Sequence, residues 1–351
     1  MLEDLFKNKK EVPFSEFVTY ALYGPKGYYK KDSHVGKKGD FLTSPILSKT
    51  YGETIANFFL TKVIHNHKSD KISLIELGPN DGSLMCSVVD YIKNSAPKIY
   101  EKLEIILIEQ NVNIHNKIAD LLDVHKKKLS IFTTIANIEK KVNESFLFCN
   151  EFFDALTFER CVMKENVLFL VNIKKENNKI SEVLVRAGDF LVTKMEQYDL
   201  QIVDNFYFEL PILEYEKYFG ELSKKFINLN ILVNDYGEKS DFFHSSPDPH
   251  GTCRCFYKHD VTRDFYNNIA NQDITYDVNF KLLSLAAKKY GFKEIGFYSQ
   301  LNFLLSNNIL DFIPTENAED NNLYLRDFKK LISPIDFGEK FKFILFKLGK
   351  N

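Results

Sequence analysis

The sequence contains no tryptophan and only five cysteines in 351 residues. Cys253 and Cys255 form its one close cysteine pair, and a C-x-C pair alone is not a zinc site. An odd number of scattered cysteines favours reduced thiols over a disulfide framework. We therefore expect no bound metal and a cytoplasmic location.

The sequence also lacks a dominant charge and a long apolar run. Its net charge is −2, so there is no global basic field for nucleic acid. No apolar run approaches the ~18 residues of a membrane-spanning helix, and the charged segment 1–11 lacks the apolar core of a secretory signal. The 44% hydrophobic and 27% charged content is typical of a soluble globular protein. We predict neither a nucleic-acid partner nor membrane insertion.

A further absence is the G-x-G-x-x-G fingerprint of dinucleotide-binding folds. The chain has instead a short apolar run over 72–77, a loop bounded by Gly78 and Gly82, and apolar residues at helical spacing over 84–92. Glycine permits positive φ and close approach of the backbone to a ligand. A strand, a glycine turn and a helix N-terminus predict a nucleotide-type site at the carboxyl edge of a parallel sheet.

Acidic residues lie at two places around this predicted site. Glu76 precedes the glycine loop, which suits a cationic or hydroxyl-rich ligand better than a pyrophosphate. S-adenosylmethionine (SAM) carries an ammonium and a sulfonium group and no phosphate. The second predicted strand, 103–109, ends in Glu109, where an acid accepts hydrogen bonds from ribose hydroxyls. A solvated strand end would also fit Glu109, but the strand–helix–strand context favours the ribose.

Polar residues follow two later strands of the predicted sheet. After a third strand at 129–132, a fourth at 146–149 runs directly into Asn150, Glu151 and Asp154. Such residues lie on the carboxyl edge, where α/β sheets carry out their chemistry. We therefore favour a catalytic role for this segment over its structural alternative, a helix cap. A strand over 228–235 ends in Asp235 and adds a further carboxylate.

The remaining segments are expected to surround the sheet. The glycine- and aromatic-rich segment 23–29 has the composition of a binding loop and predicts a lid or wall rather than an ordinary arm. Residues 160–225 differ in character and predict an inserted second lobe, whose apolar faces could form a homodimer surface. The expected elements are a helix capped by Ser44 that continues through Val63, paired strands over 162–173 and 180–192, a helix over 213–225, a helix capped by Asp273–Thr275, and strands at 292–297 and 341–348.

Several short motifs occur along the chain in the following order. They are Tyr23-Gly24-Pro25-Lys26-Gly27-Tyr28-Tyr29, Gly39-Asp40-Phe41 with Thr43-Ser44-Pro45, Glu76-Leu77-Gly78-Pro79, Asn150-Glu151-Phe152-Phe153-Asp154-Ala155-Leu156, Asp235-Tyr236-Gly237, Gly251-Thr252-Cys253-Arg254 and Asp273-Ile274-Thr275. Together they resemble the MidA family of SAM-dependent methyltransferases, over residues 13–305. The resemblance implies an α/β fold with the Rossmann-like seven-stranded sheet of class I SAM-dependent methyltransferases, and SAM as the cofactor.

The resemblance also implies a function. Mitochondrial members assist respiratory complex I assembly by methylating an arginine of a core matrix-arm subunit, and this chain looks like a bacterial relative with a protein substrate. Two alternatives are a SAM-binding assembly chaperone without turnover and a methyltransferase of another substrate. A nucleotide-dependent oxidoreductase is disfavoured by the missing fingerprint. We expect an N-terminal arm and helix (1–70), a SAM-binding core (71–159), an inserted substrate or lid lobe (160–225) and the completion of the core (226–351).

On this resemblance, each candidate residue has a role. Glu151, Asp154 and Asp235 would hold a substrate guanidinium and accept its proton. The residues expected to bind the cofactor are Asp40, Thr43, Ser44, Glu76, Gly78, Pro79, Gly82, Glu109 and Asn150. The sequence departs from the family at Asn80, where the loop usually has a middle glycine, and at Thr157, Asn234 and Asn279. Asparagine tolerates positive φ better than most residues.

Overall fold

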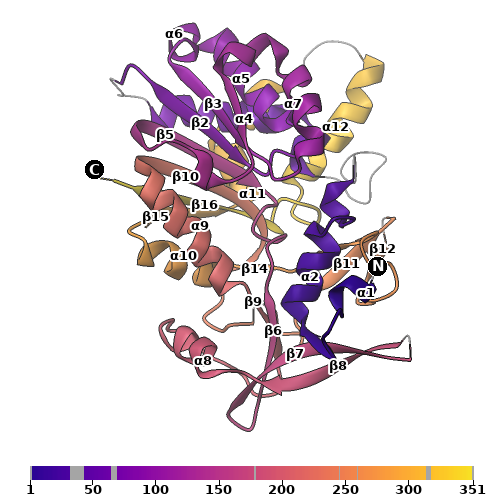
Figure 1. Ribbon diagram of the computed structural model, residues 1–351. Coiled ribbons are helices and arrows are strands. Elements are labelled where there is room, and N and C mark those ends of the chain that lie inside the picture. The colour runs from indigo at the N-terminus through magenta and orange to yellow at the C-terminus, as the bar shows by residue number, and fades with distance from the viewer. Residues whose placement is uncertain are drawn as a thin grey trace. The chain divides into compact units, whose positions relative to one another are not determined.

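The structure is a computed structural model that describes residues 2–31, 43–64, 69–177, 179–244, 246–258, 260–313 and 318–349 (Figure 1). It contains two compact units. The core unit comprises Val35–Phe152, Phe219–Tyr236 and Tyr290–Asn351, and the second unit comprises Met1–His34, Phe153–Tyr218 and Gly237–Lys289. The predicted cofactor-binding residue Asp40 lies outside the described residues.

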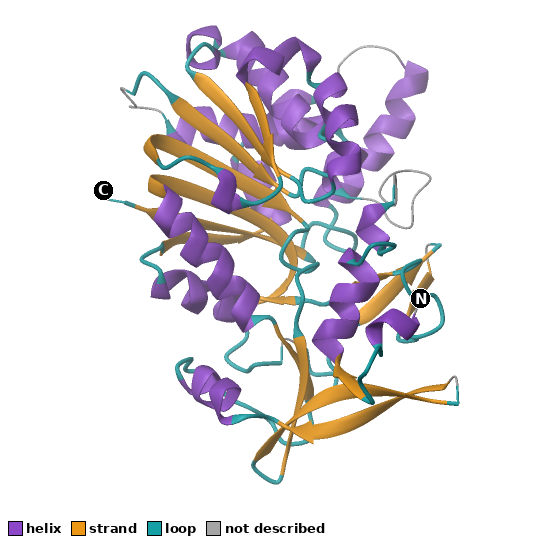
Figure 2. Ribbon diagram, viewed as in Figure 1, coloured by secondary structure: helices purple, strands orange, loops and turns teal. Residues whose placement is uncertain are grey.

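A mostly parallel sheet forms the centre of the core unit (Figure 2). Its strand order is β15-β16-β10-β5-β2-β3-β4. The strands from β10 to β4 pair in parallel, and β16 is antiparallel to both β10 and β15. The order reverses at β2, as in Rossmann-like folds, so the predicted fold class is confirmed. The bounds are β2 (Ile72–Leu77), β3 (Leu103–Ile108), β4 (Leu129–Phe132), β5 (Lys141–Asn150), β10 (Phe226–Glu238), β15 (Lys293–Ser299) and β16 (Phe341–Leu348).

Hydrophobic side chains cover both faces of this sheet. Phe343 on β16 stacks on Phe303 with 3.9 Å between ring centroids, whereas Phe346 meets Phe219 of α9 (Ile212–Lys225) edge-on at 5.6 Å. Residues 343 and 346 lie on opposite faces because side chains alternate along a strand. The other helices of this unit are α3 (Ser44–Leu47), α4 (Lys49–Phe58), the π-helix Phe59–Val63, α5 (Ser83–Ser95), α6 (Pro97–Tyr100), α7 (His115–Leu121), α11 (Gln300–Ser306), α12 (Ala318–Ile332) and the 3₁₀ helices Val112–Ile114, Asp123–Lys128, Ile135–Asn137 and Ile309–Phe312. None of the helices in the described part of the chain is long and apolar enough to cross a membrane.

The helix predicted from Ser44 to Val63 is interrupted in the structure. Ser48 has extended backbone angles, and its hydroxyl accepts a hydrogen bond from the Thr50 N–H at the start of α4. Ser44 does not cap α3 as predicted, because Thr43 occupies the N-cap position. A serine that can cap a new helix therefore divides the apolar stripe into two helices.

The second unit contains two small sheets. In one, the order is β1-β7-β6-β9, and β8 also pairs with β7; in the other it is β12-β11-β13. A further strand, β14 (Val278–Asn279), pairs with the last residues of β10. The remaining elements are α1 (Leu2–Leu5), β1 (Glu11–Pro13), α2 (Phe14–Tyr23), the 3₁₀ helix Tyr28–Lys30, β6 (Glu159–Lys164), β7 (Val167–Glu176), β8 (Lys179–Arg186), α8 (Asp189–Glu196), β9 (Tyr207–Leu210), β11 (Arg254–Tyr257), β12 (Asp260–Thr262), β13 (Asp273–Thr275) and α10 (Phe280–Lys289).

The strands predicted to pair around residues 175–179 are present as β7 and β8, but the bounds of both and the helix cap at Asp273–Thr275 were wrong. The strand expected over 162–173 is two strands, β6 and β7, joined by Glu165 and Asn166, whose positive φ angles of 51° and 61° allow a tight hairpin. The strand expected over 180–192 ends at Arg186, and α8 follows. Asp273–Thr275 is strand β13, and α10 is capped instead by Asn279, whose Oδ1 accepts from the Lys281 and Leu282 N–H groups.

Glu216, in the part of α9 that belongs to the second unit, links α9 to α8 and α10. Its buried carboxylate accepts hydrogen bonds from Lys194 of α8 at 2.5 Å, from Tyr198 at 2.8 Å and from Lys289 of α10 at 2.8 Å. Burial alone would raise the pKa of Glu216, but hydrogen bonds from these three donors outweigh it and lower the pKa. The stabilisation is therefore present above the unfolded-state pKa and is lost as pH falls through the folded-state pKa.

We expect Glu216→Gln to lower the free energy of unfolding by about 3 kcal/mol at pH 7, because it leaves two ammonium groups without a carboxylate. The deficit should shrink at about pH 4 and below. Urea unfolding at both pH values measures it. Glu214→Gln is the matched control, since Glu214 lies on the same helix in a more exposed pair with Lys217 and should change stability by about 0.5 kcal/mol or less. Equal losses in the two variants would contradict the prediction.

Candidate active site

The loop after β2 takes the strained conformation that its residues predict. Gly78, Asn80 and Gly82 all have positive φ, at 63°, 50° and 81°. The Gly78 N–H donates to the Ile108 carbonyl at 3.0 Å, which ties the loop to the end of β3. A Cβ on Gly78 would lie 2.9 Å from the Phe152 ring, so the position requires glycine for space as well as for φ. Asn80, the departure from the family pattern, keeps the left-handed turn.

This geometry makes a prediction for Asn80. We expect Asn80→Gly to leave the affinity for S-adenosylhomocysteine (SAH) within about threefold of wild type, because the backbone already holds the glycine-like conformation. Asn80→Val should cost about 1–2 kcal/mol of stability and weaken SAH binding, because a β-branched residue opposes positive φ. Calorimetric titration and thermal unfolding measure both effects. An affinity gain above about tenfold in Asn80→Gly would show that asparagine distorts the loop.

Two buried acids stand beside this loop. Glu76, the fifth residue of β2, is 3% exposed, and Glu109, the residue after β3, is 9% exposed. Burial raises the pKa of Glu76 well above its usual range; Asp81 and Glu109 add to the rise, and the Met85 N–H opposes it. One oxygen of Glu109 accepts from the Asn111 N–H at 2.7 Å. The solvated strand end considered for Glu109 is therefore wrong.

A second pair of acids lies where β5 ends beside β10. These strands are neighbours, and Asn150, the last residue of β5, is the register partner of Asn234; the strand predicted over 228–235 continues to Glu238. Glu151 directly follows Asn150 and has a positive φ of 50°. Its N–H donates to the Asn234 carbonyl at 2.9 Å. The Asn150 Nδ2 donates to Glu151 Oε1 at 2.9 Å. Asp235 follows Asn234 and is fully buried. The structure thus brings Glu151 and Asp235 to the predicted sheet edge.

Backbone strain at Glu151 points to a functional constraint. A non-glycine residue with positive φ costs of the order of 1 kcal/mol and persists where the surrounding contacts determine it. Here those contacts are the Asn234 carbonyl and the Asn150 amide, which fix the backbone and the side chain of Glu151. Glu151 is therefore held in one orientation. It lies at the edge of the sheet where β2 and β5 end, and the strand order reverses between these two strands.

The residues around the loop after β2 fit the chemistry of SAM. Glu76 Oε2 is buried, and no residue in the described part of the chain donates a hydrogen bond to it. A buried carboxylate oxygen without a donor is costly, and an ammonium or hydroxyl group of a ligand would satisfy it. The left-handed glycines expose backbone for close approach. Ser44 was predicted to contact the cofactor. In the structure its buried hydroxyl donates a hydrogen bond to Gln300 Oε1 at 3.2 Å.

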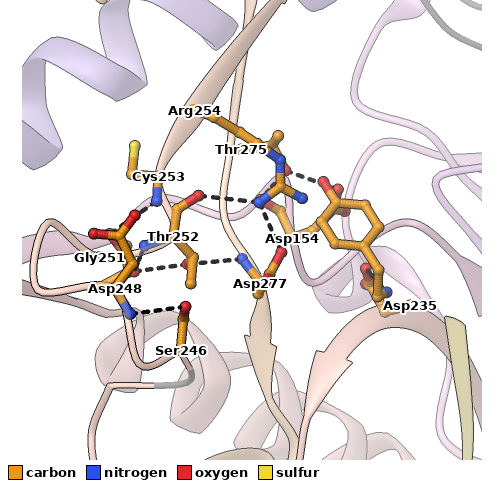
Figure 3. A network of polar contacts seen from close by, with 12 residues as sticks. Asp154, Asp235, Ser246, Asp248, Gly251, Thr252, Cys253, Arg254, Thr275 and Asp277 are labelled. Atoms are coloured by element: carbon orange, nitrogen blue, oxygen red, sulfur yellow. Dashed lines mark hydrogen bonds and ion pairs between the residues drawn. The ribbon is translucent and has the colours of Figure 1, made fainter. Parts of the chain in front are cut away.

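The third predicted carboxylate, Asp154, belongs to the second unit. Thr275 Oγ1 donates to Asp154 Oδ2 at 2.9 Å (Figure 3). Tyr29 Oη donates to Asp273 Oδ1 at 2.9 Å, and burial, followed by nearby acids that include Asp273 and Asp154, raises the pKa of Tyr29. The aromatic N-terminal segment and the Asp273 motif therefore lie beside Asp154, whereas Glu151 and Asp235 belong to the core unit.

Sequence reasoning missed a buried acid that organises the Gly251-Thr252-Cys253-Arg254 motif. Glu209 on β9 accepts hydrogen bonds from the Thr252 N–H and hydroxyl at 3.1 and 2.8 Å and from the Cys253 N–H at 3.0 Å. Gly251 has a φ of 78°, and a Cβ there would lie 2.5 Å from Glu209 Oε1. Arg254 then donates to the Thr252 carbonyl (Figure 3). The sequence signal for this role was a single acid, Glu209, among the aromatic and apolar residues of 207–210.

Comparison with known proteins assigns the chain to a family. The family Methyltransf_28, described as "Putative S-adenosyl-L-methionine-dependent methyltransferase", matches residues 54–298. Protein arginine methyltransferase NDUFAF7, mitochondrial, is 25% identical in Rattus norvegicus, covering 96% of this chain and 81% of the relative; in Bos taurus it is 24% identical, covering 96% and 80%.

A solved structure shares the fold. The crystal structure of a COG1565 superfamily member from Burkholderia thailandensis bound to S-adenosyl-homocysteine has a TM-score of 0.82 at 20% identity, covering 97% of this chain and 89% of that one. A second crystal structure of a COG1565 superfamily protein from the same organism has a TM-score of 0.80. The predicted family, fold class and cofactor are confirmed. The chain belongs to this family of SAM-dependent methyltransferases.

Proposed function

We propose that this enzyme methylates an arginine side chain of a protein. The observation that carries the proposal is Glu151, a carboxylate with strained backbone, held by the Asn150 amide at the end of β5. Asp235 lies on the neighbouring strand β10, directly after the register partner of Asn150, so both acids lie at the carboxyl end of β5. Paired carboxylates recognise a guanidinium through charge-assisted hydrogen bonds. The NDUFAF7 relatives, which are named protein arginine methyltransferases, support this substrate.

The proposed chemistry depends on positioning and on proton transfer. A guanidinium is cationic at neutral pH, since its pKa exceeds ~12. Glu151 and Asp235 would orient it so that one nitrogen faces the donor methyl, and Glu151 would accept the proton released when the N–C bond forms. Asp154, whose Oδ2 accepts a hydrogen bond from Thr275 within the second unit, is a further carboxylate proposed to act on the substrate. When bound, SAM would supply the electrophilic methyl group from its sulfonium, and the electron pair of the broken C–S bond would leave with SAH.

The cofactor-binding residues have separate proposed roles. Gly78, Pro79 and Gly82 would offer loop backbone, and Glu76 would accept from a cationic or hydroxyl group. Glu109 would accept from the ribose. Asp40, Thr43 and Ser44 would enclose the methionine end, and Asn150 would add a contact from β5.

The resemblance stated from the sequence supports a narrower proposal. The substrate is a core matrix-arm subunit of respiratory complex I, modified in the cytoplasm of a bacterial cell. The proposed partner is a protein, without nucleic acid or membrane insertion, and the apolar faces of the inserted lobe 160–225 are the proposed surface of a homodimer. The second candidate is an assembly chaperone that binds SAM without turnover, which the strained, half-buried position of Glu151 disfavours.

The test incubates the enzyme with methyl-labelled SAM and the complex I matrix-arm subunit, followed by mass spectrometry of the subunit. Monomethyl- or dimethylarginine is the expected product. A label on another residue type would overturn the arginine assignment. SAM binding without any label on the subunit would favour the chaperone. Size-exclusion chromatography with light scattering decides the oligomeric state.

A further inference from the structure

Tyr51 places one hydroxyl group between the last residue of β5 and its register partner on β10. The side chain comes from α4 and is fully buried. Its Oη lies 2.7 Å from Asn150 Oδ1 and 2.9 Å from Asn234 Oδ1. These asparagines are register partners, and each is followed directly by one of the proposed substrate-binding acids, Glu151 or Asp235.

The hydrogen-bond chemistry fixes which way the Asn150 amide points. A carboxylate only accepts hydrogen bonds, so the NH₂ end of Asn150 must face Glu151, and its oxygen must face Tyr51. Burial raises the pKa of Tyr51 well above its usual range, and the neighbouring Glu151, Cys149, Glu76 and Asp235 add to the rise. The hydroxyl therefore keeps its single proton, which the two asparagine oxygens share in a three-centre hydrogen bond. Asn234, in turn, donates from Nδ2 to the Lys342 carbonyl at 3.3 Å.

We infer that Tyr51 is a positioning residue, whose hydroxyl holds the Asn150 amide in the orientation that presents Glu151 to the substrate and links it to Asn234 and Asp235 of β10. The inference rests on the proposed role of Glu151. It also gives Asn234 a function, because an apolar side chain at this position could not meet the hydroxyl. The link spans α4, β5 and β10, so it sets the relative position of two acids that the chain separates by more than eighty residues.

The test compares Tyr51→Phe with Tyr100→Phe. Tyr100 is the control, because its buried hydroxyl meets one polar side chain, His125 Nδ1 at 2.8 Å, and it precedes β3 at the opposite edge of the sheet. Tyr51→Phe removes contacts to two polar side chains and Tyr100→Phe removes a contact to one, so both should lower the melting temperature. The SAH dissociation constant is measured by calorimetry. Methyl transfer is measured with the complex I matrix-arm subunit.

A third measurement is independent of any substrate. In protein labelled with ¹⁵N-asparagine, the side-chain amide signals of Asn150 and Asn234 are identified by their loss in Asn150→Ser and Asn234→Ser. Tyr51→Phe should shift or broaden these signals, whereas Tyr100→Phe should leave them in place. Tyr51→Phe should also lower kcat about tenfold or more, which is a larger factor than its loss of SAH affinity.

Two results would overturn the inference: unchanged Asn150 and Asn234 signals in Tyr51→Phe, or a rate loss no larger than that in Tyr100→Phe. Should wild type transfer no methyl to the subunit, the proposed function fails while the amide signals still decide whether Tyr51 positions Asn150. Shifted signals would then support the link, and unshifted signals would reject it.

Discussion

Glu151→Gln should lower kcat for methyl transfer about 100-fold while leaving SAH affinity within about threefold of wild type. Glutamine is nearly isosteric, and its amide oxygen can still accept the bond from Asn150 that Glu151 Oε1 accepts at 2.9 Å. What it loses is the negative charge that holds a guanidinium and the ability to take up the released proton, an effect typically worth 10²–10⁴-fold. Single-turnover transfer and calorimetric SAH titration separate the two quantities.

The chain offers a close control for this variant. Glu144 lies on the same strand, β5, and likewise accepts a hydrogen bond from an asparagine of β10, Asn230 Nδ2, at 2.8 Å. It lies toward the amino end of the strand, away from the predicted site. Glu144→Gln should therefore leave the rate unchanged. A Glu151→Gln rate within twofold of wild type would remove Glu151 from the catalytic residues, and a parallel loss of SAH affinity would reassign it to the cofactor.

The elements that could be predicted from the sequence are those with a local signal. Strand 72–77 is mostly apolar in sequence and buried throughout, and the helix after Gly82 follows from its spacing. Asn80 was expected to tolerate positive φ, and it has a φ of 50°. The position of Glu109 after β3 followed from the length of one apolar run. In each case short-range pattern and final structure agree.

The features that could not be predicted depend on partners distant in sequence. Ser48 ends α3 because it can cap α4, and an apolar stripe that continues across it conceals the break. Asp273 resembles a helix cap locally but pairs with β11 instead. The contacts of Tyr51 lie 99 and 183 residues away. A hydrophobic pattern places Tyr51 in a core correctly and contains no information about which polar group its hydroxyl will meet.

Glu76→Gln should produce opposite changes in binding and in stability. The buried Glu76 Oε2, which no described residue satisfies, is the proposed acceptor for a cationic or hydroxyl group of the cofactor. Hydrogen bonds to charged groups contribute about 1.5–3 kcal/mol, so SAH affinity should fall roughly 10- to 150-fold. Calorimetric titration at pH 7.5 measures this, with Glu144→Gln as a control that should bind normally.

The stability change has a sign that follows from linkage. Because burial, then Asp81 and Glu109, raise the folded-state pKa of Glu76, its contribution to stability without ligand is fully present below the unfolded-state pKa of about 4.3 and is lost as pH rises through the folded-state pKa. Glutamine has no charge to lose. Without SAH, Glu76→Gln should therefore melt at a higher temperature than wild type at pH 8, and the difference should vanish toward pH 4. Each unit of raised pKa corresponds to about 1.4 kcal/mol.

With saturating SAH at pH 8, binding stabilises wild type more than the variant. The difference in melting temperature should therefore narrow or change sign. A variant that binds SAH like wild type, or a melting difference that does not change with pH, would show that Glu76 neither faces the cofactor nor carries a buried charge.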